Sequence, residues 1–252
     1  NTVRGNTVSS NSVMGMMLES GSTGNLVDSN TVNSNSVIGM ELSQGADNNR
    51  VLNNTLNSNP TGMTVYASSS NVIIGNVLAS NVSYGFELNA CTGNVFAQNT
   101  LDSNGLYQVT ITGASSSDTF FKNNFRASTS NPDSMVSNGS TNNFDFSRNW
   151  WDTTDEVTID KRIDDTATTT PTLTFRPYRL GQVDTTSGGD TTAPGLPSGV
   201  TCTAATGYIT VTWNIPTVRE ETNGGTVGHA GAKIYRLTSA DTNHWANPAK
   251  IG

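Results

Sequence analysis

The chain has 252 residues, of which only 13% are charged, and its formal net charge is −7 at pH 7. An acidic chain without a basic stripe is not expected to bind nucleic acid. No apolar run approaches the roughly 18 residues that a membrane-spanning helix requires, so we expect no membrane span in this segment. The chain opens on Asn1 rather than on Met, and we interpret it as a processed or excised segment.

A repeat of about 23 residues begins at the first residue, and its clearest mark is asparagine at intervals of five positions. The first column of the repeat holds Asn1, Asn25, Asn49, Asn71 and Asn94, with Asp118 in the sixth place. The second column holds Asn6, Asn30, Asn54, Asn76, Asn99 and Asn123. The third column holds Asn11, Asn35, Asn59, Asn81 and Asn104.

Apolar residues form four further columns within the same repeat. Two columns lie between the asparagines: Val3, Val27, Val51, Ile73, Phe96 and Phe120, and then Val8, Val32, Leu56, Leu78, Leu101 and Phe125. Two more follow a glycine: Met16, Met40, Met63, Phe86 and Val109, and then Leu18, Leu42, Val65, Leu88 and Ile111. Alternation with a period of two predicts short strands, whereas a helix would not tolerate this much Asn and Gly.

Three short strands and three turns in each repeat predict a parallel β-solenoid, whose coils stack about 4.8 Å apart. An asparagine side chain carries both a donor and an acceptor. Stacked in register, each amide is expected to donate to the next coil and to accept from the previous one, which makes a structural ladder. Asn also tolerates the left-handed backbone of tight corners, and we expect the same role for four repeat glycines, namely Gly15, Gly39, Gly62 and Gly85.

The coils N-x-V-x-x-N-x-[VL]-x-x-N resemble the right-handed parallel β-helix superfamily of carbohydrate-binding and sugar-hydrolysing proteins, and within it the periplasmic copper-site maturation proteins of the NosD type. The resemblance covers about residues 1–180. It extends to a closing element that begins at about residue 143, marked by Asn149-Trp150-Trp151, by the stretch Ile159 to Asp164, and by Pro177-Tyr178-Arg179-Leu180. We expect this element to cap the open end of the solenoid.

Residues 181–193 read as a Gly/Thr/Ser-rich linker, and residues 194–252 resemble part of a fibronectin type III sandwich, on the basis of Pro194, Trp213 and Tyr235. Because the later strands of that sandwich are missing, either the chain is cut or another chain completes the sheet. Cys91 and Cys202 fall in different predicted domains, so lone buried thiols are favoured over a disulfide.

Glu41 and Glu87 share one column of the repeat, and alternation turns both side chains outward. They lie two coils apart, about 9–10 Å along the axis, which is at the upper edge for an inverting glycosidase pair. Tyr66 and Asn89 lie on the same face and could contact a sugar. Glu41 and Glu87 are therefore the candidate acids, and all four residues are candidate glycan contacts. The alternative is a solvated face with two ordinary glutamates.

Other candidate sites are weaker. Asp164 and Asp165 pair as in polygalacturonases but fall in the expected cap. The aligned Met16, Met40 and Met63 are expected to be core, and the threonine column that an ice-binding face would need is interrupted. No metal site or cofactor is predicted, since the only histidines are His229 and His244, and the coils hold no calcium-type aspartate cluster.

The leading prediction is a non-catalytic, prokaryotic protein of the extracellular space, cell surface or periplasm. It would act as a structural, adhesive or glycan-recognition rod whose partner is a polysaccharide or other copies of itself. A polysaccharide hydrolase or lyase with Glu41 and Glu87 as its acids is the first alternative, and a filament or surface-layer subunit is the second. One solenoid hosts all of these functions, so the fold does not choose between them.

Overall fold

The computed structural model describes residues 1–165, 173–183, 198–205 and 208–214, together with four two-residue strands further along the chain. The chain divides into two compact units, Asn1–Thr185 and Thr186–Gly252. Within the described residues, no helix is long and apolar enough to cross a membrane.

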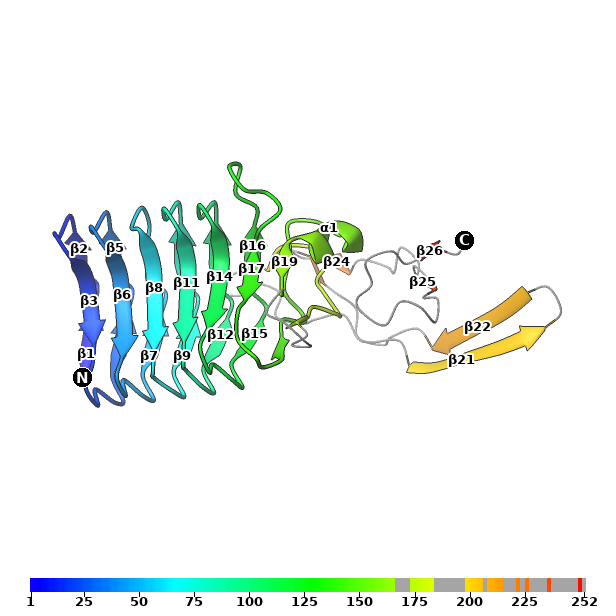
Figure 1. The fold of residues 1–252 in the computed structure, drawn as a ribbon, viewed down its shortest axis with the longest axis horizontal. Helices are drawn as coiled ribbons and strands as arrows, with labels where there is room; N and C mark the ends of the chain where they lie inside the picture. The colour runs from blue at the N-terminus through cyan, green and yellow to red at the C-terminus, as the bar shows by residue number, and fades with distance from the viewer. Residues whose placement is uncertain are drawn as a thin grey trace. The chain divides into compact units, whose positions relative to one another are not determined.

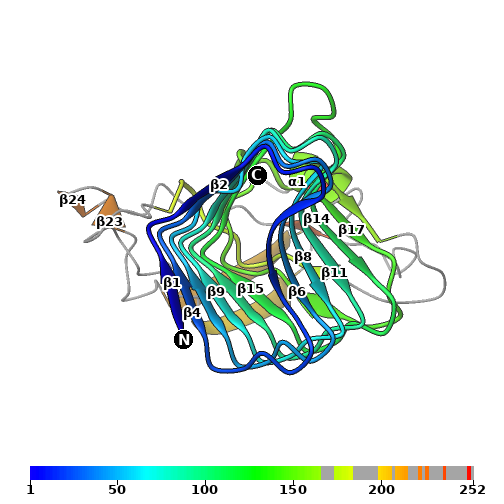
Figure 2. The ribbon, with the colours of Figure 1, turned by 90° about the vertical axis from the view of Figure 1, so that its left-hand side faces the viewer.

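The first unit is a parallel β-solenoid, in which successive coils add strands to three sides (Figure 1 and Figure 2). Sheet A has eight strands in coil order: β1 (Thr2–Arg4), β4 (Leu26–Asp28), β7 (Arg50–Leu52), β9 (Val72–Ile74), β12 (Val95–Ala97), β15 (Thr119–Phe121), β18 (Phe144–Asp145) and β20 (Leu173–Thr174). Sheet C has seven: β3 (Met14–Leu18), β6 (Ile38–Ser43), β8 (Thr61–Tyr66), β11 (Tyr84–Asn89), β14 (Tyr107–Thr112), β17 (Val136–Asn138) and β19 (Ile163–Asp164). The third side, sheet B, comprises β2 (Thr7–Ser9) with β5 (Thr31–Asn33), and β10 (Val77–Ala79) with β13 (Thr100–Asp102) and β16 (Asn124–Arg126), linked through single bridges at Thr55.

The predicted solenoid, its apolar columns and its asparagine ladders are confirmed. In the second ladder, Asn54 Oδ1 accepts from both the backbone N–H and Nδ2 of Asn30, while Asn54 Nδ2 donates to Asn76 Oδ1 at 3.0 Å and to the carbonyl of Val27. This ladder continues one coil further than the repeat indicates, because Asn149 accepts from Asn123 at a separation of 26 residues. Each buried amide is thus satisfied by its neighbours above and below, as a buried polar group must be.

The prediction for the corner residues was wrong in its details. The left-handed backbone is adopted by the residue before each ladder position, for example Ser29 and Ser34 with φ of 56° and 55°, and not by the ladder asparagines. The four repeat glycines do not have a positive φ either. They are required for close stacking, since a Cβ on Gly39 would lie 2.5 Å from the carbonyl oxygen of Gly62 and 2.8 Å from Asn59 Nδ2.

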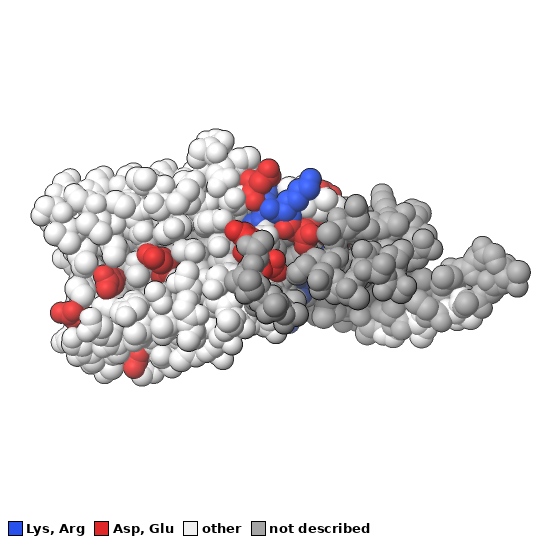
Figure 3. All heavy atoms as spheres, viewed as in Figure 1, with Lys and Arg blue, Asp and Glu red and all other residues white. Residues whose placement is uncertain are grey.

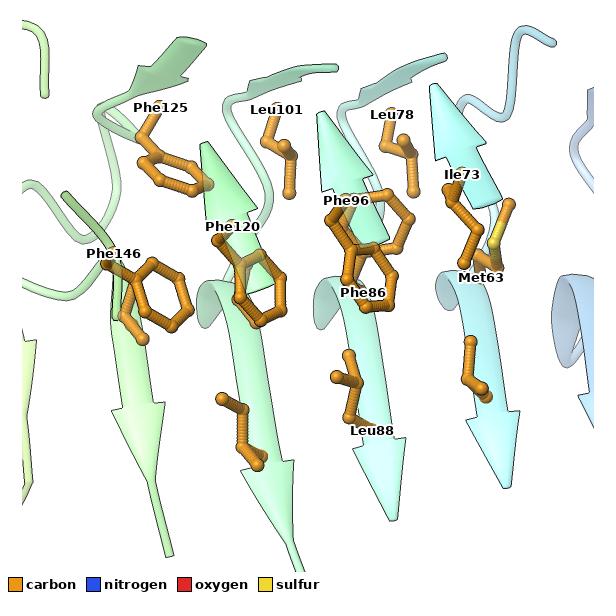
Figure 4. Close-up of a cluster of buried hydrophobic side chains, with 14 of the residues drawn as sticks. Met63, Ile73, Leu78, Phe86, Leu88, Phe96, Leu101, Phe120, Phe125 and Phe146 are labelled. Atoms are coloured by element: carbon orange, nitrogen blue, oxygen red, sulfur yellow. The ribbon is translucent and has the colours of Figure 1, made fainter. Parts of the chain in front are cut away.

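The interior of the solenoid is filled by the stacked apolar columns and becomes aromatic toward the later coils (Figure 4). The Phe96 and Phe120 rings stack at 4.5 Å, and those of Phe120 and Phe146 at 4.1 Å. Trp151 packs against Phe125 and Phe175. The single helix of the described chain, α1 (Glu156–Lys161), starts at an Asp155 N-cap that accepts from the Thr158 N–H. That residues from about 143 act as a cap remains a prediction.

The second unit is described only in its strands. An antiparallel hairpin joins β21 (Ser198–Ala205) to β22 (Tyr208–Asn214), with an irregular register between Ser198 and Thr201. Two short antiparallel pairs follow, β23 (Glu221–Thr222) with β24 (Gly225–Thr226), and β25 (Tyr235–Arg236) with β26 (Ala249–Lys250). These elements are not evidence for a fibronectin type III domain, and Pro194, His229 and His244 lie outside the described residues.

Candidate functional site

The outward face of sheet C carries one continuous column of side chains, which is polar from Glu41 onward and which we call the trough column. Its members are aligned by the parallel register of successive strands: Met17, Glu41, Thr64, Glu87, Thr110, Ser137 and Asp164. The predicted alignment of Glu41 with Glu87 is therefore confirmed. Thr64 lies between these two glutamates, and its Oγ1 donates to Glu87 Oε2 at 3.3 Å.

Two further columns flank the trough column on the same face. One contains Ile38, Thr61, Tyr84 and Tyr107, and the other contains Ser43, Tyr66, Asn89 and Thr112. The Tyr107 hydroxyl donates to Asp164 Oδ2 at 3.0 Å, which links coils that are not adjacent. Burial, and then this hydrogen bond to Asp164, raises the pKa of Tyr107 above its ordinary value. The face therefore combines carboxylates, hydroxyls and aromatic rings.

The backbone of sheet C is concave on its outward face: viewed along the solenoid axis, the coils bend inward there (Figure 2). Thr64 and Thr110 point outward by register, yet each is only 8% exposed, because neighbouring side chains shield them. Glu41 and Glu87 are half-buried, whereas Tyr66 at one side is 42% exposed. We call this recess, which runs along the axis, the trough.

The trough is acidic. None of the seven strands of sheet C contains Lys or Arg. On the face shown in Figure 3, acidic but no basic side chains appear over the early coils, and the basic ones gather further along the solenoid. Among the described residues, the ion pairs lie elsewhere: Arg4 with Asp28, Arg126 with Asp102, and Arg176 with Glu156. Glu41 and Glu87 therefore have no basic partner in this part of the chain.

An exposed apolar ridge borders the trough on the side of Tyr84 and Tyr107. It consists of Val13, Val37, Val82 and Leu106, which occupy the turn between the third ladder and sheet C in four of the coils. Val82 is 70% exposed. Beside the last of these residues, the loop between β16 and β17 rises above the other turns (Figure 1), and Asn131 Nδ2 in that loop donates to the Leu106 carbonyl. We call this ridge the apolar rim.

The structure brings together all four candidate glycan contacts and adds three residues. Tyr66 and Asn89 are register partners, two positions along from Thr64 and Glu87. Sequence reasoning missed Tyr84 and Tyr107, although both occupy one position of the repeat. It assigned Asp164 to the cap, whereas Ser137 connects Asp164 to the trough column. The irregular coil lengths after Phe125 hid this connection.

The described residues contain no group of three or more His, Cys, Asp or Glu side chains that could hold a metal ion. Met40 and Met63 are fully buried in the apolar core, as expected for their column. Cys91 is a buried free thiol, as predicted, and its Sγ donates to Asp118 Oδ2 at 3.4 Å. Burial and the nearby Asp118 raise the pKa of Cys91 to about 12, which disfavours the thiolate that metal ligation requires.

The fold is similar to that of solved alginate epimerases. A double mutant of the periplasmic alginate epimerase AlgG superposes with a TM-score of 0.56 and 18% sequence identity, over 59% of this chain and 39% of the epimerase. Another AlgG structure has a TM-score of 0.50 and 17% identity, over 60% of this chain and 39% of the epimerase. The chain thus spans about two fifths of the length of these proteins, and the likeness concerns the fold alone. Among curated proteins, none matches the chain.

One protein family matches most of the solenoid. The model of the family described as "Periplasmic copper-binding protein (NosD)" matches residues 1–163. The described residues do not fit a copper ion, because Met40, Met63 and Met135 are packed in the core, burial raises the pKa of the Cys91 thiol, and no cluster of metal ligands surrounds the exposed Met17. The stacked-asparagine solenoid and the extent of this match establish that the chain belongs to the NosD family.

Proposed function

We propose that this chain is a non-catalytic glycan-recognition rod that works outside the cytoplasm, in the periplasm or at the cell surface. Support for the location comes from the family description and from the periplasmic proteins whose fold it resembles. A rigid solenoid suits recognition of an elongated chain, because it repeats equivalent side chains at each coil along one line.

The observation that carries the proposal is the composition of the trough. Glu41, Thr64, Glu87 and Thr110 present polar oxygens on successive coils, about 4.8 Å apart. Carboxylate and hydroxyl oxygens can accept hydrogen bonds from sugar hydroxyls. Tyrosine rings on both sides offer flat apolar surfaces with a polar tip, which suits the mixed surface of a sugar ring. Ligand sites are typically lined by apolar and aromatic side chains together with a small number of polar groups that point toward the ligand.

The spacing of the acids favours recognition over hydrolysis. Glu41 and Glu87 are separated by two coil spacings, about 9–10 Å, at the far end of the range that an inverting pair uses. The Thr64 side chain occupies the position between them and donates to Glu87. A retaining pair would need the two carboxyl groups about 5 Å apart. A hydrolase or lyase nevertheless remains the alternative that the experiment must address.

A polysaccharide panel, scored both for binding and for newly released chain ends, tests the proposal. We expect binding without cleavage, and about a tenfold loss of affinity on Glu87→Gln with unchanged thermal stability. Asp145→Asn is the matched control, because it removes one exposed carboxylate from sheet A. Release of chain ends that Glu87→Gln abolishes would overturn the proposal in favour of an enzyme. No binding to any polysaccharide would overturn it in favour of a structural or filament role.

A further inference from the structure

We infer that the ligand of the trough is a chain of amino sugars, bound through its ammonium groups and not through acidic groups. This inference rests on the proposed function and specifies the substrate class of the same site. It separates this chain from the alginate epimerases whose fold it resembles, because alginate is a polymer of acidic sugars.

Charge is the first reason. Glu41 and Glu87 of the trough column form no ion pair with a described residue, and none of the strands of sheet C contains Lys or Arg. Arg4, on sheet A, is engaged with Asp28 at 2.9 Å. Like charges placed opposite each other oppose binding, whereas a complementary charge favours both encounter and specificity. Glu41 and Glu87 would therefore repel an acidic polysaccharide and attract a cationic one.

The aromatic and apolar borders are the second reason. Tyr66 stands exposed on one side, and Tyr84 and Tyr107 line the other. The face of a tyrosine ring attracts an ammonium group, because the ring face carries partial negative charge. Beyond these tyrosines, the apolar rim gives the C–H faces of sugar rings a surface on which to pack. Carboxylates on the floor and apolar groups at the border thus match a chain that is both cationic and partly apolar.

An unsatisfied hydroxyl is an independent indication of a missing partner. Ser43 Oγ is fully buried and has no hydrogen-bond partner among the described residues. By register Ser43 lies beside Tyr66, in the column that flanks the trough. A buried polar atom without a partner is costly. In the complex that we propose, the ligand displaces the side chains that cover Ser43, and one of its hydroxyl or amino groups completes the bond.

The test compares four purified ligands of equal length by isothermal titration at mildly acidic pH. They are a chitosan oligosaccharide, its N-acetylated chitin counterpart, an oligogalacturonate and an oligolysine. Chitosan and chitin differ only at the nitrogen, where an ammonium group in one is an uncharged acetamide in the other, so the ratio of their affinities reports on that group, and the salt dependence isolates its charge. We expect chitosan to bind about tenfold tighter than chitin, the oligogalacturonate to show no binding, and added salt to weaken only the chitosan complex.

Two variants connect this preference to the trough. The double variant Glu41→Gln/Glu87→Gln should remove the preference for chitosan over chitin, while Asp145→Asn, which changes the net charge elsewhere, should retain it. Ser43→Ala should weaken chitosan binding several-fold without a loss of thermal stability, because it deletes a group that is unpaired in the free protein.

The outcomes separate the two proposals. Equal binding of chitosan and chitin, or tighter binding of the oligogalacturonate, would overturn the amino-sugar inference and leave glycan recognition intact. Oligolysine binding as tight as that of chitosan would also overturn the amino-sugar inference, because binding would then depend only on the positive charge of the ligand and not on the sugar. Absence of binding by all three saccharides would overturn the amino-sugar inference, and glycan recognition itself falls only when no member of the polysaccharide panel binds.

Discussion

The second asparagine ladder and the trough column are both aligned by the parallel stacking of the coils, but they differ in how their side chains are hydrogen-bonded. In the inward ladder, every amide from Asn30 to Asn123 accepts from one coil and donates to the next. In the trough column, Glu41, Thr64, Glu87 and Thr110 point outward on successive coils. Among these four side chains, one hydrogen bond forms, from Thr64 Oγ1 to Glu87 Oε2. The ladder is closed on itself, whereas the trough column leaves acceptors available.

The difference shows how one repeat separates stability from recognition. Asparagine contains donor and acceptor in one side chain, so a stack of identical residues satisfies itself. Glutamate and threonine in alternation supply acceptors in excess, and a partner must bring the donors. Substitutions in the ladder should therefore change the free energy of unfolding, and substitutions in the trough column should change affinity.

The largest expected effect is that of Asn54→Ala in the centre of the second ladder. The change removes the acceptor of the buried Asn30 backbone N–H, one of the three acceptors of Asn30 Nδ2, and the Nδ2 donor to the Val27 carbonyl. Unpaired buried groups cost about 1–3 kcal/mol each, and partial relaxation should bring the loss in the free energy of unfolding to about 3 kcal/mol. Urea unfolding followed by circular dichroism measures it. Ser36→Ala, at an exposed position of the preceding coil, should stay within about 0.5 kcal/mol.

Gly39→Ala should have the next largest effect. Its Cβ would meet the Gly62 carbonyl at 2.5 Å and the Asn59 amide at 2.8 Å, so two coils must move apart. Overpacking of this kind costs about 1–3 kcal/mol. Gly181→Ala is the matched control, because nothing lies within 4 Å of a Cβ there. Similar melting temperatures for the two variants would show that the repeat glycines do not serve close stacking.

These two positions show what the sequence could reveal. The five-residue spacing of asparagine was enough to predict the coils, the ladders and the inward columns, because stacking in register leaves few alternatives. It was not enough to place the left-handed residues. Ser29 and Asn53 adopt φ of 56° and 54°, and the residue type at these corners varies from coil to coil. The glycine column was visible, but its cause lies in contacts between coils.

The site was predictable in part for the same reason. Glu41, Tyr66, Glu87 and Asn89 fall at fixed places of a regular repeat, so their common face followed from alternation. Asp164 did not, because the ladder spacing increases to 26 residues between Asn123 and Asn149 and the repeat can no longer be extrapolated. The recess itself depends on how far the backbone bends along sheet C, which the order of apolar residues does not determine.

A stabilising change is expected at the end of the first ladder, where Asp118 replaces asparagine. Burial raises the pKa of this carboxyl, opposed by hydrogen bonds from Asn94 and Cys91. Below its ordinary value near 3.8, the carboxyl is protonated in both the folded and the unfolded chain. As the pH rises through the folded pKa, stability is lost. Asp118→Asn should therefore gain roughly 1 kcal/mol at neutral pH, because a neutral amide avoids the cost of burying a carboxylate and its Oδ1 can still accept from Asn94.

The gain on Asp118→Asn should shrink as the pH falls toward 4. Melting temperatures measured across this range check it, with Asp133→Asn, at an exposed carboxylate, as the control. A gain that persists unchanged at acidic pH would mean that packing, and not ionisation, limits stability at this position.

The smallest effect on folding, and the sharpest contrast with the ladder, is expected for Thr64→Val. The side chain keeps its shape but loses the hydroxyl that donates to Glu87 Oε2 at 3.3 Å. A bond of this length to a half-buried acceptor contributes little, so the free energy of unfolding should change by less than about 0.5 kcal/mol. The affinity for the glycan should change instead, because the variant removes one polar group from the trough floor and leaves Glu87 free to reorient. Titration with the tightest-binding glycan measures this affinity. If Thr64→Val lowered stability as much as Asn54→Ala does, the trough column would be a second structural ladder, and the division between inward stability and outward recognition would fail.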